Sequence, residues 1–155
     1  MIIRRAENND IDGLNRLLFQ VCMVHHNGRP DLFACGGKKY TDEQLMEIIK
    51  DDTTPIFVAV DENDYMLGYS FCIINEYNEP HLAKIKTLYI DDLCVDENAR
   101  GQHIGKQLYD YVLNFAKSIG CYNVTLNVWT CNEGAMKFYE KCGLKPQKIG
   151  MEHIL

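Results

Sequence analysis

The chain has 155 residues, enough for one domain over residues 1–155 with a sizeable core. Its formal net charge of −6 argues against a nucleic-acid partner, because phosphate binding needs a dense basic patch. No apolar run is long enough to cross a membrane, and residues 1–5 do not read as a signal peptide. The 7 cysteines are scattered without a Cys-x-x-Cys pair, which predicts a reducing, cytoplasmic compartment.

The N-terminal third predicts one strand and two helices. Ile2–Ala6 is typical of a short strand, and apolar residues recur at helical spacing from Ile11 to Cys22. His25–Tyr40 contains glycine, proline and polar residues, which predict a loop. Thr41 and the residue three positions later form a capping box for a helix that ends near Lys50.

The central third predicts three strands. Pro55–Val60 and Leu67–Tyr77 have β-type composition and are joined by turn-forming residues at 61–64. A third β-rich run begins at Leu88 and carries an acidic pair, Asp91 and Asp92, before Val95. Because burying carboxylates is costly, an acidic pair within such a run suggests a functional role.

A glycine-bearing loop, Arg100–Gly105, follows this third run and leads into a long amphipathic helix. The start of a helix leaves several backbone N–H groups unpaired at the positive end of its dipole, which suits phosphate. The loop lacks the Gly-Lys-Ser/Thr ending of a P-loop and the Gly-x-Gly-x-x-Gly pattern of dinucleotide-binding folds. It therefore predicts a phosphate site of another kind.

The C-terminal third predicts a strand at Val124–Val128, a helix that begins after Asn132, and a last strand within Gln147–Ile154. The whole order is β-α-α-β-β-β-α-β-α-β. This order predicts an α/β fold with a mixed central sheet flanked by helices.

Two motifs in this order resemble those of the GCN5-related N-acetyltransferases, the GNAT family, and the resemblance covers roughly residues 86–146. The loop resembles the Arg/Gln-x-x-Gly-x-Gly/Ala pattern that holds the pyrophosphate of acetyl-CoA. The second motif resembles Asn-x-x-Ala-x-x-Phe/Leu-Tyr-x-x-x-Gly-Phe/Leu, matched by Asn132, Ala135, Phe138, Tyr139, Gly143 and Leu144. The resemblance implies a GNAT fold, with a mixed and mostly antiparallel sheet, and transfer of an acetyl group from acetyl-CoA to a primary amine.

The resemblance also implies which residues hold acetyl-CoA. The pyrophosphate would lie on the loop and first helical turn, at Arg100, Gly101, Gln102, His103, Ile104, Gly105 and Lys106. The pantetheine arm would pair with the backbone of Leu93, Cys94 and Val95, and Asn132 would cap its helix, bind cofactor amides, or do both. His103 departs from the family pattern, which usually has glycine there. Ile104 contributes its backbone, while its side chain is expected in the core.

For catalysis, the resemblance assigns Tyr139 as the acid that protonates the departing thiolate. The run YIDDLCVDENARGQHIG also resembles that of spermidine/spermine acetyltransferases, where the first acidic position serves as base, and this points to Asp91. Asp92 or a water chain remains an alternative base. A covalent route through Cys94 is disfavoured, because GNAT enzymes generally transfer directly in a ternary complex. Asn127 stands where ribosomal-protein N-acetyltransferases have a catalytic glutamate.

The acceptor is expected to be a small-molecule or peptide amine, and the sequence leaves room for a homodimer. One alternative function is a GNAT-fold sensor that binds acetyl-CoA without turnover. Another is a metal-binding regulatory domain built on a histidine and cysteine cluster near the first loop. That cluster lacks zinc-site spacing, so no metal is expected; its members are Cys22, His25, His26 and Cys35.

Overall fold

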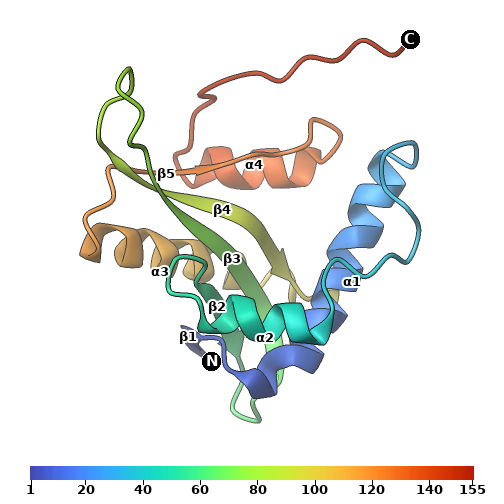
Figure 1. Cartoon of the computed structure of the whole chain (residues 1–155). Coiled ribbons are helices and arrows are strands. Elements are labelled where there is room, and N and C mark those ends of the chain that lie inside the picture. The colour runs from blue at the N-terminus through green and yellow to red at the C-terminus, as the bar shows by residue number, and fades with distance from the viewer.

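The computed structural model describes all residues from 1 to 155 and contains one five-stranded sheet flanked by four helices (Figure 1). The strands are β1 (Ile2–Arg5), β2 (Ile56–Val60), β3 (Met66–Glu76), β4 (Lys86–Val95) and β5 (Asn123–Leu126). The helices are α1 (Ile11–Gly28), α2 (Asp42–Lys50), α3 (Ile104–Ser118) and α4 (Glu133–Lys141), with short 3-10 turns η1 (Asn8–Asp10) and η2 (Glu97–Ala99). No helix combines the length and apolar character needed to span a bilayer.

The sheet follows chain order, β1-β2-β3-β4-β5. The first three pairings are antiparallel and only β4–β5 is parallel, so the prediction of a mixed, mostly antiparallel sheet is confirmed. The capping box of α2 is also confirmed, since Thr41 accepts a hydrogen bond from the backbone N–H of Gln44. This bond satisfies one of the free donors at the helix start.

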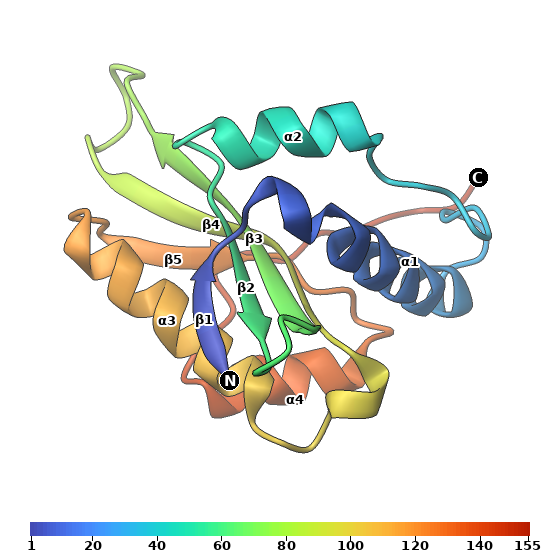
Figure 2. The same ribbon diagram turned by 90° about the horizontal axis from the view of Figure 1, so that it is seen from below.

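The two faces of the sheet are covered by different helices (Figure 1 and Figure 2). Alternate residues of β2 point to opposite faces: Val58 packs with α1 and α2, whereas Phe57 packs with α3. The side chains of Phe138 and Leu144, from α4 and the turn after it, pack on the α3 side. The sheet is thus the middle layer of an α/β/α arrangement.

Strands β4 and β5 separate part-way along β4. Their parallel pairing ends at Ile90 and Leu126, whereas β4 continues to Val95 paired only with β3. The β3–β4 register shifts at this point and leaves Asp91 without a partner, as a β-bulge does. The splay and the bulge together open one edge of β4 over residues 91–95.

Two expectations about the chain are wrong. The segment after α4 is not a strand: Gln147–Ile154 forms no backbone hydrogen bond with any other segment, because it leaves the sheet and meets no strand edge. The segment His25–Gly28 is helical rather than loop, so His25 and His26 lie in the last turn of α1. The helix ends where the chain reaches Gly28 and Pro30, and histidines are favourable at a helix C-terminus.

Candidate active site

The loop between η2 and α3 presents a row of free backbone donors. The N–H groups from Gly101 to Lys106 form no hydrogen bond within the chain, and the first helical bond of α3 runs from the N–H of Gln107 to the carbonyl of His103. These six donors lie at the positive end of a 15-residue helix. Such a row can bind a dianionic group such as a pyrophosphate.

Left-handed backbone shapes this loop. Gly101 has φ +79° and His103, the N-cap of α3, has φ +61°. The usual glycine of the family loop would meet no strain at the His103 position, whereas a side chain there adopts a conformation that L-residues disfavour. His103 keeps its backbone N–H donor and exposes its ring to solvent. Histidine in place of glycine therefore adds conformational strain but leaves the N–H group of this position in place.

The start of α3 packs closely on neighbouring elements. A Cβ at Gly105 would lie 3.4 Å from Phe138 of α4 and 3.4 Å from Val95 of β4, which is tighter than usual contact. Ile104 is buried as expected. The ammonium of Lys106 bonds to Asp110 one turn later, so in this structure only its backbone N–H faces the loop.

The open edge of β4 lies beside this loop. Cys94 is paired with Tyr69 of β3 and turns its backbone groups toward that strand, so the alternate residues Leu93 and Val95 turn theirs to the open side. Free donors and acceptors at a strand edge can pair with an extended amide-containing chain. The three residues predicted to hold pantetheine lie on the splayed segment, but only Leu93 and Val95 offer backbone groups at its open edge, because those of Cys94 face β3.

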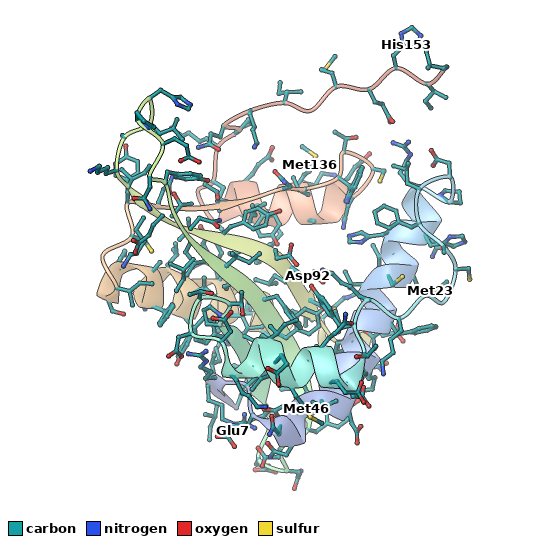
Figure 3. All side chains as sticks on the ribbon, viewed as in Figure 1. Glu7, Met23, Met46, Asp92, Met136 and His153 are labelled. Atoms are coloured by element: carbon teal, nitrogen blue, oxygen red, sulfur yellow. The ribbon has the colours of Figure 1, made fainter.

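The acidic pair lies at the bulge. Figure 3 shows Asp92 near the centre of the molecule, below α4 in this view. Its carboxylate accepts a 2.9 Å hydrogen bond from the hydroxyl of Tyr69, which is fully buried. Burial raises the pKa of Asp92; the Lys39 charge and the Tyr69 bond oppose this, and the net pKa is above the ordinary value.

Asp91 has a different environment. Its carboxylate bonds to the ammonium of Lys39 at 2.9 Å, across 52 positions of sequence. Partial burial lowers the pKa of Lys39, but the Asp91 bond and the charges of Asp92 and Asp91 outweigh it, so that pKa is raised. Lys39 and Tyr69 were not predicted as site residues, because nothing local in a glycine-rich loop or a β-run indicates contact with β4.

Tyr139 lies on α4, facing the same region. Burial is the largest cause that raises the pKa of its hydroxyl, and the charge of Asp92 is the next largest, so the phenol stays protonated. No hydrogen bond to the backbone holds this hydroxyl. Asn132 caps α4, since its side-chain oxygen accepts from the N–H of Ala135 at 3.1 Å, and its side-chain NH₂ remains available to a ligand.

A family model described as the acetyltransferase (GNAT) family matches residues 23–144. The chain belongs to this family. The prediction made from the two motifs is therefore confirmed, and GNAT membership places the chain among the acetyl-CoA-dependent acyltransferases.

The chain is similar to one solved structure and to two named acetyltransferases. The structure resembles that of a mutant of the BH1408 protein from Bacillus halodurans with a TM-score of 0.95 and 31% identity, over 100% of this chain and 99% of that one. A glucosamine 6-phosphate N-acetyltransferase of Arabidopsis thaliana is 38% identical over 66 residues, which are 43% of this chain and 42% of the relative. The peptidyl-lysine N-acetyltransferase YjaB of Salmonella typhimurium is 30% identical over 104 residues, 66% of this chain and 59% of that protein. The matches to these two enzymes thus span about two fifths and three fifths of their lengths.

Cys94 lies on the splayed part of β4 and is poorly suited to nucleophilic attack. It is buried, and burial, followed by the charge of Asp92, raises the pKa of its thiol to about 12. Its sulfur faces the carbonyl of Leu17 at 3.7 Å. Because the thiolate is the nucleophilic form, this environment disfavours a covalent acetyl-cysteine.

Three members of the histidine and cysteine cluster make packing or hydrogen-bond contacts with the loop after α1. The ring of His25 lies 5.0 Å from the ring of Phe33, and Nδ1 of His26 lies 2.6 Å from the Phe33 carbonyl. Cys22 points toward the carbonyl of Ala34, while Cys35 is exposed. These contacts fix the loop after α1, which borders the acidic pair through Lys39.

Proposed function

We propose that this protein transfers an acetyl group from acetyl-CoA to a primary amine by direct attack in a ternary complex. The observation that carries the proposal is the continuity of the site. The free N–H groups of Gly101–Lys106 adjoin the open edge of β4, which leads to Asp92 and Tyr139. Pyrophosphate, pantetheine and thioester would occupy these three parts in that order.

In the proposed reaction, a carboxylate at the bulge first takes a proton from the substrate ammonium. The free amine then attacks the thioester carbonyl, forming a C–N bond as the C–S bond breaks. Tyr139 donates its proton to the departing sulfur and regains one from the nitrogen through solvent. The products are an amide, CoA with a free thiol, and one proton.

We favour Asp92 as the base, while the sequence points to Asp91. Asp92 has a raised pKa and is half-buried, so it is a stronger base than an ordinary carboxylate yet is reached from the site. Asp91 is already paired with a cation, Lys39. Asp91 as base stays a prediction, and the two variants distinguish the alternatives.

The acceptor is proposed to be a cationic amine of a small molecule or a peptide. Lys39 shows that an ammonium group is stabilised beside the two carboxylates. Aromatic side chains lie on the same side: Phe33 contacts Trp129 edge-on at 5.3 Å between ring centroids, and Tyr40 stacks on Phe71 at 5.8 Å. Aromatic side chains of this kind can pack against an amine that has an aliphatic or aromatic portion.

The test is an amine panel assayed for release of free CoA, including polyamines, aminoglycosides, amino acids and lysine-containing peptides. We expect sustained release with at least one amine class and a strongly reduced rate in Tyr139→Phe. The matched control is Tyr122→Phe, which removes the same oxygen from an exposed tyrosine. Acetyl-CoA binding without release for every amine would instead support the sensor function.

A further inference from the structure

A cation of the chain itself lies beside the acidic pair of the proposed acceptor site. The ammonium of Lys39 bonds to the carboxylate of Asp91 at 2.9 Å. Its charge also acts on Asp92, as does that of His25 in the last turn of α1. Both carboxylates of the pair therefore attract the Lys39 ammonium in the free protein.

This ammonium lies where the acceptor must arrive. A carboxylate takes a proton from an ammonium only within hydrogen-bond distance, about 2.6–3.2 Å. An acceptor ammonium that reaches Asp92 would therefore come close to the charge of Lys39. The two like charges repel each other, and the burial of Asp92 limits screening of that repulsion by water. The acceptor and Lys39 thus compete for one acidic pair.

Lys39 can leave this place without disrupting the fold. Residues 35–40 form no backbone–backbone hydrogen bond, so the position of Lys39 depends on side-chain contacts. Its side chain is 41% exposed, which leaves the ammonium a way into solvent. The next residue, Tyr40, stacks on Phe71 of β3 and anchors the loop when the Lys39 side chain moves. The ion pair of Lys39 with Asp91 is therefore separable from the packing of the loop.

Taking acetyl transfer to an amine as the function, on which this inference rests, we propose that Lys39 fills the ammonium subsite in the free protein and withdraws when the acceptor binds. The two carboxylates then have separate roles, because Asp91 binds the acceptor ammonium and Asp92 takes its proton. Lys39 is not acetylated itself. Its pair with Asp91 keeps it as an ammonium, which has no free electron pair for attack on a thioester.

Competition of this kind weakens acceptor binding by a predictable factor. A partly exposed ion pair is expected to be formed roughly two to five times as often as it is broken. The apparent affinity for the acceptor falls by the fraction of molecules whose subsite is free. Removal of the Lys39 ammonium should therefore tighten acceptor binding roughly three- to sixfold.

The experiment measures amine binding by isothermal titration in the presence of CoA, which carries no acetyl group and so allows no turnover. The probes are spermidine, kanamycin and a lysine-containing peptide. We expect at least one of them to bind Lys39→Met roughly three- to sixfold more tightly than the wild-type protein, at unchanged CoA affinity. The control Lys38→Met removes the same charge at the next position, where the ammonium bonds to Asp42 instead, and should bind the amine as the wild type does.

Several results would overturn the proposal. Unchanged or weaker amine binding in Lys39→Met would mean that Lys39 does not compete, and an equal gain in Lys38→Met would reveal a general effect of charge. Absence of binding of all three amines to Lys39→Met would also contradict it. Nitrogen NMR of the lysine side chains tests the withdrawal in the wild-type protein: the Nζ signal of Lys39 should change when the amine is added, and a constant signal would refute the displacement.

Turnover separates this proposal from the acetyltransferase function itself. An amine that binds Lys39→Met more tightly but is never acetylated would support the displacement of Lys39 and contradict acetyl transfer. An amine that is acetylated with the same KM by the wild-type protein and by Lys39→Met would support acetyl transfer and contradict the displacement.

Discussion

Gly101 offers the sharpest test of the phosphate loop, because its substitution by alanine perturbs backbone conformation and little else. Its φ is +79°, and a Cβ there would meet no atom within 4 Å. The cost of Gly101→Ala is therefore conformational, about 1 kcal/mol for a left-handed alanine. In a domain of this size that keeps the left-handed backbone when free, that cost lowers the melting temperature by about 2–4 °C.

Gly120, at the end of α3, is a matched control. Its φ is +75° and a Cβ there also meets nothing within 4 Å, but it lies at the far end of the helix from the loop. Gly120→Ala should lower the melting temperature by a similar amount. The two variants thus share one local perturbation and differ only in distance from the proposed pyrophosphate.

Acetyl-CoA affinity should separate the two variants. In Gly101→Ala we expect the free loop, which no other part of the chain holds by hydrogen bonds, to relax out of the left-handed conformation. The strain then disappears from the melting temperature and reappears on binding, because acetyl-CoA needs the left-handed backbone. A cost of about 1 kcal/mol corresponds to roughly fivefold weaker binding. Isothermal titration should give this loss for Gly101→Ala and unchanged affinity for Gly120→Ala. A Gly101→Ala variant that melts like the wild type, and so has relaxed, yet binds acetyl-CoA as tightly as Gly120→Ala would refute the assignment of the loop to the pyrophosphate.

Four further predictions concern single side chains. Asp92→Asn should slow turnover most near neutral pH, where the amine is largely protonated, and less as the amine's own pKa is approached. In the wild-type protein, the raised pKa of Asp92 should place the acid limb of the rate profile above that of an ordinary carboxyl. A pH-independent deficit in Asp92→Asn, together with a pH-dependent one in Asp91→Asn, would transfer the role of base to Asp91. Tyr139→Phe should lower the saturated rate about 10- to 100-fold with little change in acetyl-CoA affinity, and full turnover where chemistry limits the rate would exclude the hydroxyl as proton donor. Cys94→Ala should keep turnover within a few-fold in steady-state assays, whereas complete loss with an acetyl group trapped on the wild-type sulfur would establish a covalent route. His103→Gly should raise the melting temperature by about 1 °C or slightly more, because the relief of left-handed strain exceeds the added freedom of glycine in the unfolded chain; a lower melting temperature would mean that the ring of His103 makes a stabilising contact.

The sequence was most informative where structure is local. The loop before α3 could be predicted because a strand, a glycine-bearing turn and an amphipathic helix follow one another within a few turns of chain. The same holds for the Asn132 cap, which bonds to a residue three positions later. Both motifs depend on spacing along the chain, which the sequence contains directly.

The acceptor side could not be predicted in the same way. Whether Asp91 or Asp92 faces the site depends on a bulge that breaks the alternation of β4, and on pairing with β3. Lys39 reaches Asp91 from a loop whose path is set by packing rather than by local preference. The left-handed φ of His103 could not be predicted either, because the usual sequence sign of a left-handed backbone is glycine rather than histidine.

The C-terminal segment failed as a strand prediction for a third reason. Ile149 and Met151 alternate with polar or small residues, but a strand also needs a partner edge, and alternation alone does not supply one. In the single chain the segment stays unpaired.

The central claim is direct acetyl transfer from acetyl-CoA to an amine, and mass spectrometry of a reaction with the best amine of the panel tests it most directly. The account predicts that each acetylated amine appears with one free CoA thiol, while the mass of the intact protein stays unchanged throughout turnover. Free CoA that forms without acetylated amine, or an acetyl group that accumulates on the protein and then passes to the amine, would contradict it.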